Sequence, residues 1–356
     1  MAHRSWCVLQ SCCLYFLVSV AAPPAAAQLD LGPQQIIQAG GADMQVNGFS
    51  VPCYADWNND GLMDLIIGEG GSSSAFTGVR VYLNEGAASD PQFSGYSYVQ
   101  ADGADLAYDG SACPACFPMS LFPRAVYWDD DGLKDLLVGQ FDGTVKIYLN
   151  VGTDEDPTFD AGTFLEAGPA GMKTQMFVGA TATPAIVDWN NDGSRDLLVG
   201  NYTGRLHLFL NQGTDALPDF AAGTLLELGG AELVVPTMRS APVVLDLDGD
   251  GRKDILSGNR EGQLLLYSNV GTDTAPAFSG YTLVQSEGVP IDLGPDFNAR
   301  PFVCDWTGDG RADVLVGLGD GQVYLYQGVP EPTVLTLLTF GGSALIRRNR
   351  RSATSG

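Results

Sequence analysis

Five short acidic segments recur along the chain and hold the residues best suited to chemistry. They begin at positions 56, 127, 188, 246 and 305. Each has oxygen-bearing side chains at its third, fifth and ninth positions and glycine at its sixth, and the first position is Asp in every copy except the one that starts at Tyr127. A unit of about sixty residues that recurs this regularly predicts a repeat architecture.

The spacing of these side chains is typical of a calcium-binding loop. Calcium takes six to eight oxygen ligands, and oxygens at positions one, three, five and nine of a tight loop converge on one point. Glycine at position six permits the sharp turn, and position seven contributes its backbone carbonyl. We therefore predict four to five structural Ca²⁺ ions. The predicted ligands are Asp56, Asn58, Asp60, Leu62 and Asp64; Asp129, Asp131, Leu133 and Asp135; Asp188, Asn190, Asp192, Ser194 and Asp196; Asp246, Asp248, Asp250, Arg252 and Asp254; and Asp305, Thr307, Asp309, Arg311 and Asp313.

Two alternatives to calcium stay open at this point. The carboxylates could accept hydrogen bonds from backbone amides alone, or magnesium could bind with fewer protein ligands and more water. The chain has 42 acidic and 18 basic residues and a formal net charge of −24, so bound cations would offset self-repulsion. The same excess of acid argues against nucleic acid as a partner. The segment that starts at Tyr127 is expected to be the weakest site.

Short strands are expected around each acidic segment. Residues 241–245 form an apolar strand before one segment, residues 136–139 form one after another, and residues 144–150 alternate as a third strand. Residues 93–100 and 278–285 read as fourth strands. Four short strands per unit, joined by glycine turns, indicate a propeller blade. We predict an all-β fold, a five-bladed β-propeller of four-stranded antiparallel blades.

The ring is expected to close through the N-terminus. After the fifth acidic segment the chain supplies a strand at residues 322–327 but no fourth strand. Residues 36–44 resemble residues 98–106, which follow the first segment. The N-terminal strand is therefore predicted to complete the last blade and remove the exposed edge. The propeller domain is expected to span residues 28–328.

The repeated loops, such as Asp56-Trp-Asn-Asn-Asp-Gly-Leu-Met-Asp64, resemble those of the FG-GAP and VCBS repeat families, which include the propeller of integrin α-subunits. The resemblance covers about residues 28–328 and implies an extracellular propeller whose loops hold calcium. Many relatives have seven blades, so the count of five rests on the closure argument.

Both ends of the chain have the composition of processing signals. Residues 1–27 carry a basic start, an apolar stretch and a small-residue cleavage pattern, which indicate a signal peptide. Residues 329–351 combine Pro-Glu-Pro, an apolar stretch and an arginine cluster, and resemble the PEP-CTERM sorting signal of Gram-negative bacteria. That resemblance implies transient membrane anchoring, an exosortase-type processing enzyme, and delivery to the bacterial cell surface or matrix. A plain C-terminal anchor is the alternative, and residues 352–356 form a short tail.

Few other residues suggest chemistry. His207 lies within an apolar strand pattern, and the tryptophans at position two of four segments are expected to pack between blades. Cys113 and Cys116 are close enough in sequence for a local disulfide in an oxidising compartment. A redox or zinc role lacks a partner pair.

Two functions remain open for such a chain. The first is a binding or adhesion module for extracellular polysaccharide or protein, and the second is a glycan-active hydrolase or lyase with paired carboxylates outside the metal loops. The acids at positions 102, 105, 109 and 166 show no spacing that selects a pair. The longest loops, 69–78 and 102–123, are expected on the face away from calcium. Candidate ligand contacts there are Phe76, Tyr108 and Phe117.

Overall fold

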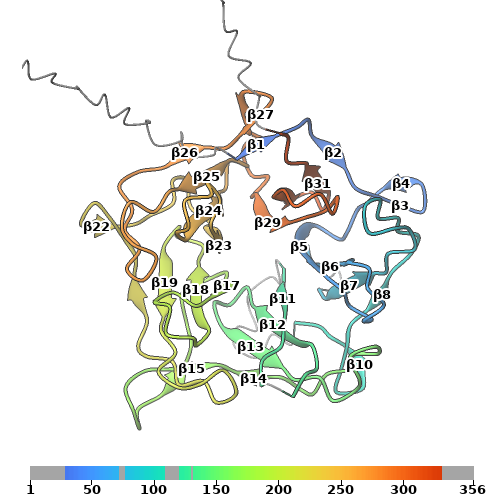
Figure 1. Ribbon diagram of the computed structural model, residues 1–356. Coiled ribbons are helices and arrows are strands. Elements are labelled where there is room, and N and C mark those ends of the chain that lie inside the picture. The colour runs from blue at the N-terminus through green and yellow to red at the C-terminus, as the bar shows by residue number, and fades with distance from the viewer. Residues whose placement is uncertain (1–28, 72–76, 109–119, 130, 331–356) are drawn as a thin grey trace, which may run out of the picture.

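The computed structural model describes residues 29–71, 77–108, 120–129 and 131–330, and these residues form an all-β structure without helices. Their strands build five four-stranded antiparallel sheets, which Figure 1 shows around a common axis. Sheet 1 holds β5 (Phe49–Ala55), β6 (Asp64–Gly70), β7 (Val79–Tyr82) and β8 (Ser97–Tyr98). Sheet 2 holds β11 (Phe122–Val126), β12 (Asp135–Gly139), β13 (Val145–Tyr148) and β14 (Thr163–Phe164).

The next two sheets follow the same order. Sheet 3 holds β17 (Thr183–Val187), β18 (Asp196–Gly200), β19 (Leu206–Phe209) and β20 (Thr224–Leu225). Sheet 4 holds β23 (Ala241–Leu245), β24 (Asp254–Gly258), β25 (Leu264–Tyr267) and β26 (Thr282–Leu283). The first strand of each sheet is the one nearest the axis (Figure 1).

Sheet 5 draws its strands from both ends of the described chain. It holds β29 (Arg300–Cys304), β30 (Asp313–Gly317) and β31 (Val323–Tyr326), and its fourth strand is β2 (Gln35–Ile36). Gln35 pairs with Leu325, and Ile36 pairs with Tyr324, in antiparallel register. The pairing between the N-terminal strand and the last unit, which the sequence predicts, is therefore present.

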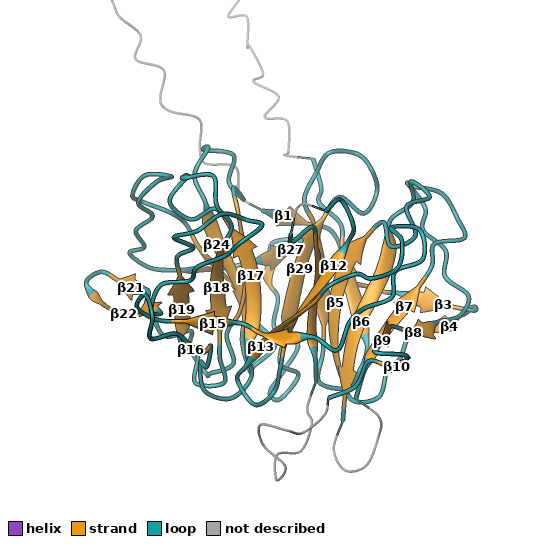
Figure 2. Cartoon of the chain, turned by 90° about the horizontal axis from the view of Figure 1, so that it is seen from below, coloured by secondary structure: helices purple, strands orange, loops and turns teal. Residues whose placement is uncertain are grey.

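Small hairpins connect the sheets around their outer rim, as Figure 2 shows from the side. They are β3 (Gln38–Ala39) with β4 (Ala42–Asp43), β9 (Gln100–Ala101) with β10 (Ala104–Asp105), β15 (Glu166–Ala167) with β16 (Thr174–Gln175), β21 (Glu227–Leu228) with β22 (Ala231–Glu232), and β27 (Gln285–Ser286) with β28 (Val289–Pro290). The first strand of the chain, β1 (Asp30–Leu31), pairs in parallel with β27.

The fourth strands are much shorter than the sequence predicts. Within the expected segments 93–100 and 278–285, only Ser97–Tyr98 and Thr282–Leu283 pair with the third strand of their sheets. Phe93 and Phe278 at the start of these segments instead form bridges to the hairpin of the preceding unit, at Ala39 and Leu228. The chain divides its pairing between two neighbouring units, which shortens the strand but ties the units together.

The core lies between neighbouring sheets. Five clusters of buried apolar residues each combine side chains of two adjacent sheets, and one of them joins sheet 5 to sheet 1. Residues of the second strands, such as Leu65, Leu197 and Val314, are fully buried. Burial on both faces explains why these strands are continuously apolar rather than alternating.

A glycine at or near the end of each second strand permits close packing of sheets. A Cβ on Gly68 would lie 1.9 Å from the carbonyl oxygen of Leu121 in the next unit, which no side chain tolerates. The same contact recurs at the last unit, where a Cβ on Gly317 would lie 2.3 Å from the carbonyl oxygen of Ser50. Sheet 5 therefore meets sheet 1 as sheet 1 meets sheet 2.

Aromatic pairs fill the gaps between units. Trp57, Trp128 and Trp189 each pack against a phenylalanine of the following unit, at ring-centroid distances of 5.7, 6.2 and 6.3 Å. Trp306 packs in the same way, 5.9 Å from Phe93. All four tryptophans are buried, which supports their expected role in packing between blades.

Candidate functional site

The five acidic segments form the connections between the first and second strands of the sheets. Glycine at position six adopts the left-handed conformation in all five, with φ between 82° and 89° at Gly61, Gly132, Gly193, Gly251 and Gly310. Position four is also left-handed, at φ 54° in Asn59 and 58° in Asn191, a conformation that Asn tolerates better than most residues. The expected sharp turn is therefore built into each loop.

The side chain of the first-position aspartate accepts hydrogen bonds from backbone N–H groups of its own loop. Both carboxylate oxygens of Asp188 accept hydrogen bonds, from Asp192 N at 3.1 Å and Gly193 N at 3.0 Å. Asp56 and Asp305 do the same in their loops. The loop that begins at Tyr127 lacks this acid, and there Asp129 accepts a longer bond of 3.3 Å from Asp131 N.

The ninth-position aspartate is buried and links two segments of the backbone through its side chain, which we call a staple. The sequence pattern does not reveal this role. Asp64 is fully buried, and its two oxygens accept hydrogen bonds from Trp57 N at 2.8 Å and Asn84 N at 2.7 Å. It thus joins the loop to the end of the third strand. Burial raises the pKa of this carboxyl, and the two backbone bonds oppose that rise. The same contacts recur at Asp135, Asp196, Asp254 and Asp313.

Other oxygens of the loops are available to a cation. Asn58 Oδ1 and Thr307 Oγ1, both at position three, are buried and have no hydrogen-bond partner among the described residues. In two loops three carboxylates converge, with one oxygen from each lying within 4.8 Å of the others: Asp129, Asp131 and Asp135, and Asp246, Asp248 and Asp254. These donors are hard oxygen atoms, the kind that calcium prefers. The acidic clusters can therefore hold a metal ion.

Two loops contain an internal cation of their own. The guanidinium groups of Arg252 and Arg311, at position seven, pair with the position-five carboxylates of Asp250 and Asp309. The bond from Arg252 is the main cause that lowers the pKa of Asp250. In the loop of sheet 1 the position-five carboxylate of Asp60 instead accepts a bond of 2.9 Å from Asn58 Nδ2.

A second recurring motif supports three of the loops and was missed in the sequence. The residue at position eight is basic in these loops, and it forms an ion pair with an aspartate that follows the third strand. Lys134 pairs with Asp154 at 2.7 Å, and Lys253 pairs with Asp273 at 2.9 Å. Arg195 pairs with Asp215 at 3.3 Å. The signal is the repeated Gly-Thr-Asp at 152–154, 213–215 and 271–273.

Of the predicted ligand contacts and disulfide cysteines, only Tyr108 lies within the described residues. Tyr108 is half-buried, packs beside the core cluster of sheets 1 and 2, and donates from its hydroxyl to Asp142 Oδ2 at 3.3 Å. Phe76, Phe117 and the predicted disulfide partners Cys113 and Cys116 lie outside the described residues. Cys53 and Cys304 are present as free thiols.

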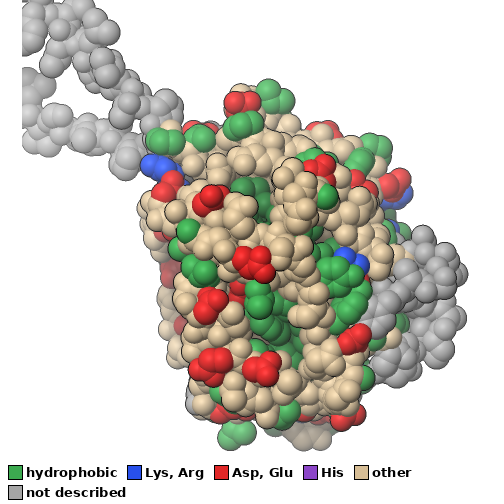
Figure 3. All heavy atoms as spheres, turned by 90° about the vertical axis from the view of Figure 1, so that its right-hand side faces the viewer, with side chains coloured by type: hydrophobic (Ala, Val, Ile, Leu, Met, Phe, Trp, Pro, Cys, Tyr) green, Lys and Arg blue, Asp and Glu red, His purple; other side chains and the backbone are tan. Residues whose placement is uncertain are grey.

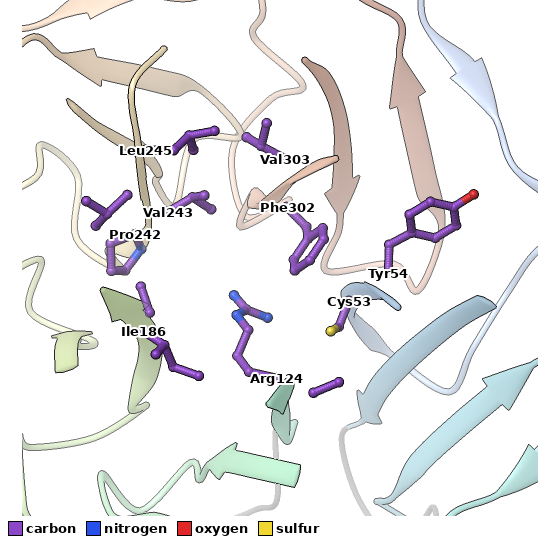
Figure 4. A pocket seen from close by; sticks show the side chains of 12 residues that line it. Cys53, Tyr54, Arg124, Ile186, Pro242, Val243, Leu245, Phe302 and Val303 are labelled. Carbon is purple, nitrogen blue, oxygen red and sulfur yellow. The ribbon is translucent and has the colours of Figure 1, made fainter. Parts of the chain in front are cut away.

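The sheets surround an axial cavity of about 300 Å³ (Figure 4). All five first strands contribute to its wall, with Cys53, Arg124, Ala185, Val243 and Phe302 at matching positions. Within the part of the chain that the structure describes, its lining includes one arginine and no Asp or Glu. The outer surface, by contrast, is rich in acid, as Figure 3 shows for the side that faces its viewer.

Comparisons with known proteins agree with the repeat. The family model described as FG-GAP-like repeat matches residues 246–316, which include the acidic loops of sheets 4 and 5. The chain carries an FG-GAP-like repeat. Integrin alpha-4 of Xenopus laevis is 28% identical over 201 residues, which cover 52% of this chain and 18% of that protein. The chain thus spans less than a fifth of this relative's length.

Solved structures resemble the chain more distantly. A GH43_1 enzyme from Xanthomonas citri, complexed with xylose, is 13% identical, with 84% of this chain and 92% of that chain covered and a TM-score of 0.47. The α-L-arabinofuranosidase PaAbf62A from Podospora anserina is 10% identical, with 86% and 98% covered and a TM-score of 0.45. The Tc holotoxin pore of Photorhabdus luminescens is 16% identical, with 83% and 12% covered and a TM-score of 0.39.

No helix long and apolar enough to cross a membrane occurs in the described residues. The expected signal peptide and the apolar part of the expected sorting tail lie outside them.

Proposed function

We propose that this chain is a secreted or surface-displayed calcium-binding β-propeller that acts as a binding or adhesion module for polysaccharide or protein. Its five sheets would be the blades of a closed ring. Three repeated contacts support closure: the β2–β31 pairing, the core cluster shared by sheets 5 and 1, and the close approach of Gly317 to Ser50. In a closed ring each blade packs between two neighbours, which leaves only short, protected sheet edges and makes a rigid scaffold for recognition.

Calcium is the ion that the loops suit best. The partnerless oxygens at position three and the converging carboxylates supply the oxygen-only donor set that calcium needs. The buried carboxylates at position nine have pKa values raised by burial, and a divalent cation beside them would favour their ionised form. The residues proposed to hold each ion are the ligands that the sequence pattern identifies. The proposed role of the ions is structural.

The residues that line the axial cavity favour a binding function over glycoside hydrolysis. Glycoside hydrolysis uses two carboxyl groups that flank the scissile bond, about 5 to 9.5 Å apart. The described residues around the cavity include no carboxylate, and Asp102, Asp105 and Glu166 lie exposed on the rim hairpins. The carboxylates that do converge are committed to the loops. Recognition without bond cleavage fits this distribution of acids.

The proposed location is supported by the composition of the two ends of the chain and by the repeat. A signal peptide at residues 1–27 and a sorting tail at 329–351 would place the propeller at the bacterial surface or in the extracellular matrix, after processing by an exosortase-type enzyme. The FG-GAP-like repeat, matched at 246–316, supports an extracellular setting.

The test joins calcium dependence to ligand binding. The purified protein is melted with calcium and with excess EDTA, and then applied to an array of polysaccharides and surface proteins in both conditions. We expect chelation to lower the melting temperature, added calcium to restore it, and binding on the array to need calcium. Reducing-sugar release from the bound polysaccharides would instead identify an enzyme, and a melting curve unaffected by EDTA would remove the structural calcium.

A further inference from the structure

Arg124 points into the axial cavity. It lies on β11, and Figure 4 shows its guanidinium near the middle of the cavity, between Cys53, Phe302 and Ile186. Its Nη1 donates to the carbonyl oxygens of Pro123 at 2.8 Å and Pro52 at 3.4 Å. Both bonds come from the same nitrogen, so within the described residues the other N–H groups of the fork are left for a ligand in the cavity.

Two further arginines lie near the start of two first strands: Arg300 is two residues before the cavity residue Phe302, and Arg239 is two residues before the start of β23. Arg300 on β29 is 6% exposed, and its Nη1 donates to the carbonyl oxygen of Asn298 at 3.0 Å. Arg239 donates from Nη1 to Asn298 Oδ1 at 2.6 Å, and its Nε is buried without a partner among the described residues. Both guanidinium groups lie over the ring of Phe49, at 4.7 Å for Arg300 and 5.7 Å for Arg239.

None of these three arginines forms an ion pair with a carboxylate of the described residues. Nine other basic side chains of that part of the chain do. The contrast is informative because acids outnumber bases by 42 to 18 in the sequence. Among the described residues no Asp or Glu lines the cavity, so the positive charge of Arg124 has no carboxylate partner there.

The burial of these charges is costly without a counter-ion. Burial, together with the nearby charge of Arg239, lowers the pKa of Arg300 to about 9. Burial also lowers the pKa of Arg124. Thr237, Met238 and Arg239 have φ values of 64°, 79° and 60°, a left-handed conformation that is unfavourable for residues other than glycine. Backbone strain of this kind clusters at active sites and ligand-binding sites.

We propose that the axial cavity binds an oxyanion carried by a compact ligand, with Arg124 binding it directly and Arg300 and Arg239 adding positive charge. The planar fork of arginine suits carboxylate, sulfate and phosphate groups. A cavity of about 300 Å³ limits the ligand to a small group such as an acidic sugar residue. This inference names a ligand class for the proposed binding function, on which it rests.

Calorimetry on the full calcium-loaded protein tests it with two matched sugars. We expect glucuronate to bind at least about tenfold more tightly than glucose at equal ionic strength, because one charge-assisted pair distinguishes them. Sodium sulfate is the second probe, and it reports whether an oxyanion binds without the sugar. Glucuronate that binds no better than glucose would overturn the proposal without any variant.

Variants then assign the site. Arg124→Met should abolish the preference for glucuronate and leave the melting temperature equal or higher, because it removes an unneutralised buried charge. Arg205→Met is the control, since Arg205 is an exposed arginine paired with Glu232. An Arg124→Met protein that binds glucuronate like the parent would also overturn the proposal. Binding on the array without discrimination between these sugars would refute this inference alone, whereas loss of all array binding would refute the proposed function and leave the cavity result standing.

Discussion

Leu31 and Gly328, at opposite ends of the described chain, face each other in an antiparallel bridge. Bonds on either side extend it, from Gly32 N to Gln327 O at 2.8 Å and from Val329 N to Asp30 O at 3.0 Å. In sheets 2, 3 and 4 the corresponding bridge joins an asparagine after the third strand to a phenylalanine, as between Asn269 and Phe278. Leu31 thus takes the place of that phenylalanine. Leu247 lies in the same core cluster, and it replaces the tryptophan found at its position in the other loops.

Leu31→Ala therefore tests whether the N-terminal segment belongs to the cooperative fold. Leu31 is 1% exposed, and its truncation should lower the free energy of unfolding by about 2–5 kcal/mol. Val289→Ala, on the nearby exposed strand β28 (66% exposed), should change it by no more than about 0.5 kcal/mol. Urea unfolding of both variants gives the comparison. Equal midpoints would mean that the two ends do not close the ring.

The sequence allowed much of this fold to be predicted because its signals are local and repeated. The strand 241–245 has the predicted bounds, and the glycine turns follow from the spacing of the loops. The shortness of the fourth strands could not be predicted. Their residues have a strand-like pattern in the sequence, whether they pair within one sheet or divide their pairing between two neighbouring units. The staple role of Asp64 was also hidden, since a carboxylate that accepts two backbone bonds and one that binds a metal look alike in a sequence. The axial arginines carry no motif, and only the packing of five strands brings them together.

Glu69 and Arg80 form a buried ion pair in sheet 1, and Glu69→Gln should break it. Glu69 is fully buried, 2.7 Å from Arg80 Nη2, and accepts further bonds from Tyr98 OH and Asn47 N. The neutral amide would leave the guanidinium uncompensated, so we expect a loss of about 3–5 kcal/mol in the free energy of unfolding. Glu166→Gln, at an exposed position, is the control. A loss no larger than the control's would show that water reaches Arg80.

His207 should make stability fall in mild acid. Its pKa is lowered, first by burial and then by the charge of Arg205. Its Nε2 lies 3.3 Å from Asn201 Nδ2, whose amide is oriented by three bonds to Oδ1, so the ring nitrogen acts as the acceptor and is unprotonated. Below about pH 6.5, His207 is protonated in the unfolded chain but stays neutral in the folded chain, because its pKa is lower there. The free energy of unfolding therefore declines as the pH falls, until the pH reaches the pKa of His207 in the folded state.

His207→Gln provides the comparison for that pH dependence. The glutamine can still accept from Asn201 but does not titrate. We expect the free energy of unfolding of the parent, measured in urea at pH 7.5, 6.5 and 5.5, to fall more steeply than that of the variant. Parallel slopes would mean that His207 titrates alike in both states.

The final prediction ranks two metal loops, those of Asp188 and Asp129. Asp188→Ala removes an acid whose two oxygens both hold loop amides, whereas Asp129→Ala removes a single longer bond from a loop that already has Tyr127 at position one. In calcium at about tenfold above the dissociation constant, an intact site adds roughly 1.4 kcal/mol to stability. Asp188→Ala should therefore lose more stability than Asp129→Ala, and EDTA should narrow the difference because it removes the contribution of the ion from both. The converging oxygens of Asp129, Asp131 and Asp135 define the outcome that would contradict this ranking. If the two variants lose equal stability in calcium, those three carboxylates suffice for a full site, and the first-position acid is a loop anchor rather than a ligand.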